Sequence, residues 1–338
     1  MIEVTCNDNP LVSLITPGWN GRTFVHRLLD SILSQTYSNM EYIYVDDGST
    51  DGTKDVVLSY KERFLARGIP FQYIWKENGG VSSAVQEGLK HINGEFFCWP
   101  EYDDFLTPDS VEKKVKYLQA HPDCAIVTAD AWLVKENDAN HPYGLLSNNN
   151  PNRFDRNHFV QALLSNSIYN AACQMCRTSV FDETHPGRKI YSSLIGPNWQ
   201  ILLPIYYKYN RGFIDKPLSY FLIREDSISH GNYATYEKRA ASIIEFEKAI
   251  KETLKTIKMP QEDMDLYMDM VDQKYANDRI VLGYQAMDRD ILIQGLDYYY
   301  NSGKSIPKDF KKYERIVQSP MRFKLLNIAR NIKHFMNK

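Results

Sequence analysis

A cluster of carboxylates follows an aromatic, strand-like run in FFCWPEYDDF, residues 96 to 105. Glu101, Asp103 and Asp104 are so close in the chain that their charges repel unless a cation sits among them or water surrounds them. Carboxylate oxygens are hard ligands suited to Mg²⁺ or Mn²⁺, and an ion held by one or two of them keeps positions for diphosphate oxygens. The stretch predicts either a metal site that a substrate completes or a solvated acidic turn before the helix start TPDS.

A second pair of carboxylates ends the run EYIYV in VDDGSTDGT, residues 45 to 53. Asp46 or Asp47 could accept a charge-assisted hydrogen bond from a nucleobase N–H or a ribose hydroxyl. The alternative is a capped turn between a strand and a helix, which Gly48 would permit. The chain has no GxxxxGK[ST] here and no GxGxxG after its first strand, which argues against a Walker nucleotide-hydrolysing enzyme and a dinucleotide dehydrogenase.

Alternating strand and helix patterns position these clusters. Strands are expected at 11–16, 41–45, 71–75, 95–99 and 124–134, with helices at 22–36, 53–67, 81–91 and 108–120. Such alternation predicts an open α/β sheet whose ligand lies beyond the carboxyl ends of the strands. Those ends carry four polar clusters that should converge on one crevice: Pro17 to Asn20, Asp46 to Asp51, Lys76 to Gly80, and Glu101 to Asp104.

The second half of the chain changes character. Residues 135–157 are rich in Asn, Asp and Pro and predict a long loop, and GFIDKPLSYFLIRE at 212–225 predicts a β-hairpin. From about residue 233 the pattern is helical. We therefore expect two regions, an α/β domain over 1–232 and a helical region over 233–338.

The composition bounds the class of protein. With 338 residues and 43% hydrophobic content the chain can bury a real core, and a net charge of −2 gives no general attraction to nucleic acid. Five cysteines without a framework spacing suit a reducing compartment, and the lone CxxC at 173–176 is interpreted as buried thiols. The acidic N-terminus is not typical of a signal peptide, and no apolar run approaches the ~18 residues of a membrane span. A cytoplasmic protein is expected.

The last 35 residues are strongly basic. Residues 304–338 contain ten Lys or Arg and two acidic residues, an excess of +8, so the preceding 303 residues carry −10. Within this tail, residues 321–338 place apolar side chains at helical spacing among basic ones. That pattern is typical of a helix lying on an anionic membrane, at the inner face of the cell membrane for a cytoplasmic protein, and equally of a helix docked on the protein's own core.

Several motifs, taken in order, resemble family 2 glycosyltransferases with the GT-A fold. They are VSLITPGWN at 12–20, DSILSQTYSNMEYIYVDDGSTDGT at 30–53, ENGGVSSAVQEGLKHINGEF at 77–96 and EYDDFLTPDS at 101–110. The resemblance is nearly continuous over residues 11–134 and weaker to about 230. It implies a Rossmann-like, mostly parallel open sheet flanked by helices, and an inverting transfer of a sugar from a nucleotide sugar, expected to be a UDP-sugar.

The resemblance also implies roles for individual residues. Glu101-Tyr102-Asp103 stands where the family has its DxD element, so Glu101 would reach the ribose and Asp103 would hold Mn²⁺ or Mg²⁺. In REDSISH, Arg224 would bind the diphosphate and His230 would be a further metal ligand; the alternative is that both lie on the surface of a hairpin loop. The residues expected at the donor nucleotide are Pro17, Asn20, Asp46, Asp47, Asn78, Gly79, Glu101 and Tyr102.

The sequence departs from the family at the expected catalytic base. IGPNWQ at 195–200 has Pro197-Asn198 where the family has Glu-Asp, and a carboxamide cannot act as a carboxylate base. Either Asp130 or Asp104 takes the proton, or Asn198 only orients the acceptor by accepting its hydroxyl hydrogen, with Trp199 on the acceptor side. A packed helix start is the structural alternative.

Three functions remain open at this point. The first is a glycosyltransferase acting on a glycan or lipid-linked acceptor in cell-surface polysaccharide or glycoconjugate synthesis, as a monomer or an oligomer. The second is a catalytically silent nucleotide-sugar binding module, which would explain Asn198 directly. The third is a nucleotidyltransferase, for which LITPGWNGRT is a poor match because it lacks an early Gly-rich phosphate loop.

Overall fold

Two compact units divide the chain. The computed structural model describes residues 8–193, 196–224, 235–319, 321, 323 and 324. The first unit comprises Met1–Arg224 and Glu252–Lys258, and the second comprises Glu225–Lys251 and Met259–Lys338. Each unit has its own apolar cluster and is taken separately below.

The first unit is built on one open sheet. Within the described residues it has nine strands in the order β3-β2-β1-β4-β8-β6-β9-β5, with β7 paired to β6. The longest pairings, β1 with β2 and β6 with β9, are parallel, while β5, β7 and β8 pair antiparallel with their neighbours. The strands are β1 (Val12–Gly18), β2 (Met40–Asp46), β3 (Phe71–Trp75), β4 (Phe96–Cys98), β5 (Phe105–Leu106), β6 (Cys124–Lys135), β7 (Gly144–Leu145), β8 (Gln174–Arg177) and β9 (Asn210–Ile223).

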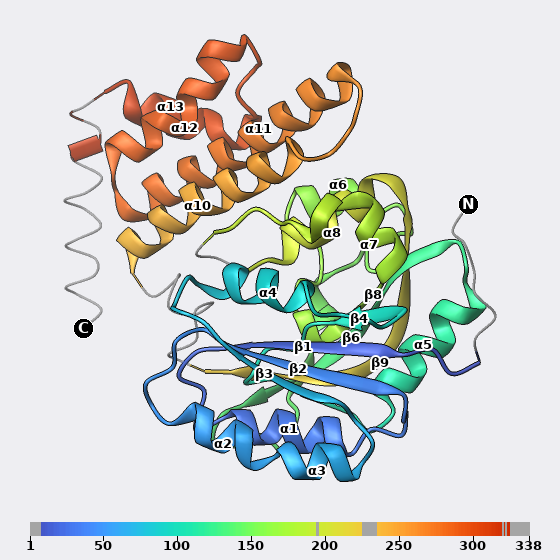
Figure 1. Cartoon of the computed structure of the whole chain (residues 1–338). Coiled ribbons are helices and arrows are strands. Elements are labelled where there is room, and N and C mark those ends of the chain that lie inside the picture. Colours follow the sequence, from blue (N-terminus) through green and yellow to red (C-terminus); the bar gives the residue numbers. More distant parts are fainter. Residues whose placement is uncertain (1–7, 194–195, 225–234, 320, 322, 325–338) are drawn as a thin grey trace. The chain divides into compact units, whose positions relative to one another are not determined.

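Helices cover both faces of this sheet. Figure 1 shows α1, α2 and α3 on one face and α4, α7 and α8 on the other. The helical segments are α1 (Val25–Leu33), α2 (Thr53–Ser59), α3 (Lys61–Ala66), α4 (Val81–Leu89), α5 (Ser110–Ala120), η1 (Leu146–Asn149), α6 (Phe159–Leu163), η2 (Ala171–Cys173), α7 (Thr178–Thr184), η3 (Pro186–Arg188) and α8 (Asn198–Lys208). The predicted α/β fold with an open, mostly parallel sheet is confirmed.

The core explains why these segments form these elements. In α1, Val25, Leu28, Leu29 and Ile32 repeat at helical spacing, are fully buried, and pack on the apolar side chains of β1 and β2. On the opposite face, Gly88 lets α4 approach β1 closely, since a Cβ there would lie 2.4 Å from the side chain of Ile15. The four cysteines among the described residues are free and buried, as the sequence predicts.

The predicted β-hairpin at 212–225 is wrong. Its residues up to Ile223 belong to β9, a single strand of 14 residues that runs parallel to β6. The turn signal Asp215-Lys216-Pro217 is accommodated by a shift of register, because Ala129 pairs with Ile214 and the next residue of β6, Asp130, pairs with Pro217. A proline fits such a bulge, where it removes no ladder hydrogen bond, so the strand continues instead of reversing.

Two other sequence-based expectations need refinement. The helix predicted over 53–67 is divided at Tyr60 into α2 and α3. The long loop predicted over 135–157 contains the short strand β7 and the turn η1, which returns to the end of β6.

The second unit is helical. It contains most of α10 (Tyr236–Leu254), then α11 (Gln261–Ala286), α12 (Arg289–Ser302), η4 (Lys308–Phe310) and α13 (Lys311–Val317). Ile280, Leu292, Leu296 and Tyr299 form the centre of its apolar cluster. In the part of the chain that the structure covers, no helix combines the length and the apolar character that crossing a membrane requires.

Candidate active site

The carboxyl ends of β1 and β2 meet at one edge of the sheet. Gly18 and Asp46 are partners in the parallel register, so the two polar clusters begin side by side. Just beyond the strands, the backbone N–H of Asn20 donates to Ser49 Oγ (2.9 Å), and the backbone N–H of Thr50 donates to Asn20 Oδ1 (2.9 Å). Pro17, the partner of Val45 in this register, is buried within β1.

Asp46 and Asp47 are both buried and hydrogen-bonded. Asp46 accepts from the backbone N–H of Ser49 (2.7 Å) and from the hydroxyl of Tyr73 on β3 (2.5 Å). Asp47 accepts from Lys76 Nζ (2.6 Å) and from the backbone N–H groups of the Gly79-Gly80 turn. The second carboxylate therefore fixes the loop that joins β3 to α4, because it binds three of that loop's donors.

The same loop depends on two glycines. Gly80 precedes α4 with φ +85°, a conformation that favours glycine. Gly48, at φ +78°, lies against the neighbouring loop, where a Cβ would be 2.9 Å from the backbone nitrogen of Asn78. Asn78 and Gly79 are thereby held next to the turn that carries Asp46 and Asp47.

The residues Glu101–Asp104, here called the acid loop, connect β4 to β5. The ring of Tyr102 packs on Gly21, where an added Cβ would lie 2.6 Å away, so the acid loop adjoins the cluster that follows β1. Asp103 forms an ion pair with Arg224 (2.9 Å), whose guanidinium also donates to the hydroxyl of Tyr102 (3.3 Å). Arg224 follows β9 directly, and this long-range contact brings the first residue of REDSISH to the acid loop.

Two carboxyl groups of the acid loop, those of Glu101 and Asp104, have raised pKa values. Burial and then the charge of Asp103 raise the pKa of Glu101 to about 7, although Arg224 acts in the opposite direction. Burial, followed by the charges of Asp103 and Glu101, also raises the pKa of Asp104 well above its usual range. Both pKa shifts come first from burial, which disfavours the charged form, and then from the charge of the neighbouring carboxylates. A nearby divalent cation would favour the charged forms of these carboxyls, and their hard oxygen atoms fit Mg²⁺ or Mn²⁺.

The protein offers such an ion only a partial set of ligands. Within the described ranges, no three His, Cys, Asp or Glu side chains converge as a preformed metal centre. His230, expected as a further ligand, lies outside the described residues. A divalent ion at Asp103 would therefore take part of its coordination from water and from the oxygens of a bound diphosphate.

Asn198 begins α8 and is connected to the start of the acid loop. Its Oδ1 accepts a hydrogen bond from the indole N–H of the fully buried Trp99 (2.9 Å), two residues before Glu101. This is the oxygen that was expected to accept the acceptor's hydroxyl hydrogen, and Trp99 occupies one of its two lone pairs. Trp199, the next residue, lies against Tyr169 with ring centroids 4.5 Å apart.

Both carboxylates proposed as alternative bases are buried. Asp104 is 1% exposed and accepts from Asn170 Nδ2 (2.7 Å). Asp130, also 1% exposed, accepts from the backbone N–H of Ala131 and from both the backbone N–H and the hydroxyl of Ser147. These hydrogen bonds of Asp130 all lie within β6 and η1, whereas Asp104 belongs to the acid loop itself.

Four residues of the site were not identified by sequence reasoning. Tyr73 and Trp99 had a local signal, since each lies at or near the end of a strand that leads into a polar cluster. Asn170 had none, because residues 165–170 form an irregular loop whose approach to Asp104 is a tertiary contact. Phe24, which lies under the guanidinium of Arg224, was included only as part of the helix predicted over 22–36.

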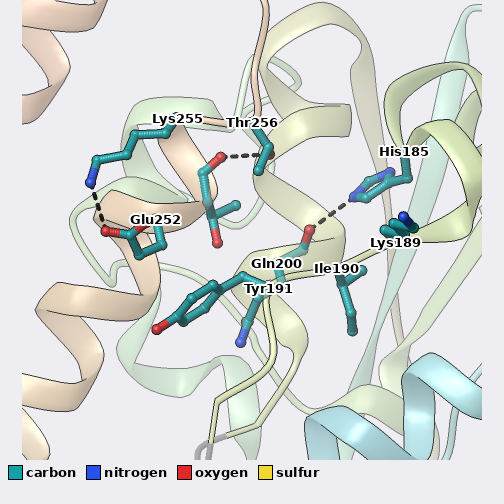
Figure 2. A pocket seen from close by; sticks show the side chains of 9 residues that line it. His185, Lys189, Ile190, Tyr191, Gln200, Glu252, Lys255 and Thr256 are labelled. Atoms are coloured by element: carbon teal, nitrogen blue, oxygen red, sulfur yellow. Dashed lines mark hydrogen bonds and ion pairs between the residues drawn. The ribbon is translucent and has the colours of Figure 1, made fainter.

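A separate cavity of about 290 Å³ lies beside α8 and the last turn of α10. Figure 2 shows its lining, which includes His185, Tyr191, Gln200, Glu252 and Lys255. Several of its polar groups pair with one another: His185 Nε2 lies 2.9 Å from the backbone oxygen of Gln200, and Lys255 forms an ion pair with Glu252 (2.6 Å). None of the predicted site residues lines this cavity.

Comparison with known proteins agrees with this arrangement. An uncharacterized glycosyltransferase of Rickettsia typhi is 41% identical over 110 residues, which are 32% of each chain, so the match spans about a third of that relative. The structure of S. aureus TarS 1-349 in complex with UDP-GlcNAc has a TM-score of 0.55 at 15% identity, covering 88% of this chain and 93% of that one. A mannosyltransferase from Pyrobaculum calidifontis in complex with GDP-Man and Mn²⁺ has a TM-score of 0.54 at 16% identity, covering 97% and 88%.

At such low identities the two solved structures show a shared fold. The family assignment rests on a different comparison, in which the model of glycosyl transferase family 2 matches residues 13–184, just over half of the 338 residues. That segment contains the first three strand-end clusters and the acid loop. The chain belongs to glycosyl transferase family 2.

Proposed function

We propose that the protein transfers a sugar, a hexosyl or N-acetylhexosaminyl group, from a UDP-sugar to a hydroxyl of a glycan or lipid-linked saccharide. The observation that carries the proposal is the convergence of the four polar strand-end clusters, of which the acid loop is one, together with Arg224. The structural neighbours support it: one is a complex with UDP-GlcNAc and the other a complex with GDP-Man and Mn²⁺. Cell-surface polysaccharide or glycoconjugate synthesis would be the setting.

The donor side would work through charge. Asp46 and Asp47 would set the nucleobase and ribose pocket, with Asp47 acting by holding the Gly79-Gly80 turn, and Glu101 would reach the ribose. Asp103 would hold Mn²⁺ or Mg²⁺, which as a Lewis acid stabilises the negative charge of a departing diphosphate. Arg224 would bind the diphosphate oxygens bidentately.

The acceptor side would work through position. Inversion requires the acceptor hydroxyl to attack the face of the sugar opposite the departing diphosphate, and its proton must then leave. Asn198 cannot take that proton, so it would orient the acceptor beside Trp199, and Asp104 is the better placed of the two alternative bases because it belongs to the acid loop. Orientation alone can lower the barrier by several kcal/mol.

The proposal has a location and an alternative. Cysteine usage favours a cytoplasmic protein, and the basic tail favours peripheral contact with an anionic membrane at its inner face; no nucleic-acid partner is proposed. The alternative is a silent nucleotide-sugar binding module, which the carboxamide of Asn198 favours. A nucleotidyltransferase finds no support in the family assignment. Measuring the release of UDP with and without acceptor distinguishes the glycosyltransferase from the silent binding module.

Thermal unfolding with UDP and Mn²⁺ tests the donor site. Saturating UDP plus Mn²⁺ should raise the Tm by several degrees, because a ligand at a hundred times its Kd adds about 2.7 kcal/mol to the free energy of unfolding. Asp103→Ala should abolish this increment. Asp30→Ala is the matched control. It also removes an aspartate paired with an arginine (2.9 Å), but Asp30 has no role in the proposed donor site. An undiminished increment in Asp103→Ala would remove Asp103 from the site.

A further inference from the structure

Three neighbours among the described residues help to hold Arg224 in place. Its guanidinium pairs with Asp103 at 2.9 Å, donates to the hydroxyl of Tyr102 at 3.3 Å, and lies 4.2 Å from the centroid of the Phe24 ring. The side chains of Arg224 and Asp103 are 6% and 14% exposed, so water screens this ion pair far less than a surface pair. The contacts and burial of this ion pair show that it is a well-ordered part of the site and not an incidental surface contact.

This ion pair conflicts with the roles of its two members in the loaded site. There, Asp103 would face a divalent cation and Arg224 would face a diphosphate. A guanidinium in contact with Asp103 would lie within a few ångströms of a divalent ion on the same carboxylate, and the two positive charges repel strongly in a poorly screened site. Contact of the Arg224 guanidinium with Asp103 should therefore weaken the binding of a divalent ion to the same carboxylate.

We propose that Arg224 competes with the divalent ion for Asp103, and that the diphosphate relieves this competition by drawing Arg224 to its own oxygens. Free metal then binds weakly, and metal and nucleoside diphosphate strengthen each other's binding. The second half of this inference rests on the proposed function. A diphosphate can draw Arg224 away from Asp103 because arginine binds phosphate oxygens bidentately. The effect of the diphosphate on metal affinity and the effect of the metal on diphosphate affinity must be equal by thermodynamic linkage.

The test titrates the full chain with Mn²⁺ and measures the electron paramagnetic resonance signal of the unbound ion. Without nucleotide, Arg224→Gln should bind Mn²⁺ about tenfold more tightly than wild type, because one nearby positive charge is gone. Adding UDP should tighten Mn²⁺ binding in the wild type and do so less in Arg224→Gln. Arg63→Gln is the matched control: it also removes an arginine paired with an aspartate at 2.9 Å, and its Mn²⁺ affinity should equal that of the wild type.

A second variant, Phe24→Leu, tests the same competition in case Arg224→Gln does not fold. Phe24→Leu keeps Arg224 but removes the ring beneath it, so Mn²⁺ binding without UDP should tighten by a smaller factor. Unchanged or weaker Mn²⁺ binding in a folded Arg224→Gln overturns the competition. Tighter Mn²⁺ binding in Arg224→Gln together with no effect of UDP on any form would support the competition and refute the nucleotide role, so the two failures are distinguishable.

Discussion

The carboxamide of Asn198 has a defined orientation. An indole N–H can only donate, so the atom 2.9 Å from Trp99 Nε1 must be the amide oxygen. The Nδ2 of Asn198 then has no hydrogen-bond partner among the described residues, so it can donate to a substrate. Asn198 would therefore orient the acceptor by donating to one of its oxygens, and Trp99 would position it.

The first prediction at the residue scale concerns this pair. Asn198→Ala should lower turnover roughly tenfold to a hundredfold with donor KM unchanged, because orientation is lost while the donor side is intact. Trp99→Phe should also lower turnover, but not further in the Asn198→Ala background, since Trp99 would act only through Asn198. Acceptor-dependent release of UDP measures all four forms. Additive losses in the double variant would contradict the positioning role of Trp99.

Asn198→Asp supplies the contrast. One carboxylate oxygen can keep the bond from Trp99 and the other can act as a base, so the variant should remain active and gain a titrating group that alters the pH profile of kcat. Wild type that is inactive with every acceptor tried, alongside an active Asn198→Asp, would favour the silent binding module.

Residue-scale features show where sequence reasoning is sufficient. The acid loop and the strand-end clusters could be predicted, because each follows a strand and parallel strands deliver their carboxyl ends to one edge. Phe24 and Asn170 could not, because each reaches the site through a contact of one side chain with a distant segment. The pairing of Arg224 with Asp103 spans 121 positions and likewise leaves no local pattern.

At the scale of elements, the same limit appears in β9. Asp215-Lys216-Pro217 is a turn signal in isolation, but the parallel pairing with β6 on both sides of it absorbs the irregularity as a bulge opposite Asp130. Tertiary pairing overrides the local preference here. Beyond the bulge the pairing continues to Ile223, and Arg224 follows directly and contacts Asp103. An element that sequence reasoning misassigned therefore helps to position the site.

The contact among α6, α8 and β9 predicts a pH dependence of stability. His158, directly before α6, is fully buried; its ring lies 5.6 Å from that of Tyr206 on α8. Burial and then the charge of Arg211 on β9 lower the pKa of His158 to about 3. The unfolded chain, with a histidine pKa near 6.5, binds the proton first, so this group's stabilisation is complete above pH 6.5 and is lost as the pH falls toward 3.

At pH 4.5 the loss should be about 2–3 kcal/mol relative to pH 7.5, since each pH unit below 6.5 costs about 1.4 kcal/mol. Urea unfolding of the wild type and of His158→Gln at both pH values measures it. The variant should lose that much less stability on acidification than the wild type. Equal losses in the two proteins would show that His158 is not the titrating group.

At the scale of the whole molecule, two units with separate cores divide the work of folding. The sequence predicts an α/β unit followed by a helical unit, because its pattern of apolar residues changes from alternating strand and helix patterns to helical patterns alone. The grouping of residues 252–258 with the first unit has no such signal, because it depends on contacts made by the end of a helix that otherwise belongs to the second unit.

Charge is divided as unevenly as structure. The last 35 residues carry +8 and the rest −10, and residues 325–338 lie outside the described residues. The apolar and basic pattern of residues 321–338 leads us to propose that this segment associates with an anionic membrane surface. Five of its residues are Lys or Arg, each adding about 1 kcal/mol near such a surface at low salt.

The full chain should therefore sediment with vesicles containing anionic lipid at low salt and be released at high salt, because salt screens the attraction. It should not sediment with zwitterionic vesicles. Deleting residues 321–338 should abolish the association, whereas replacing Lys308, Lys311 and Lys312 by Gln, which removes charge outside the amphipathic segment, should only weaken it. If the full chain does not bind anionic vesicles at low salt, the segment has a structural role instead. A helix whose apolar face is covered by the protein's own core has no apolar face left to contact lipid.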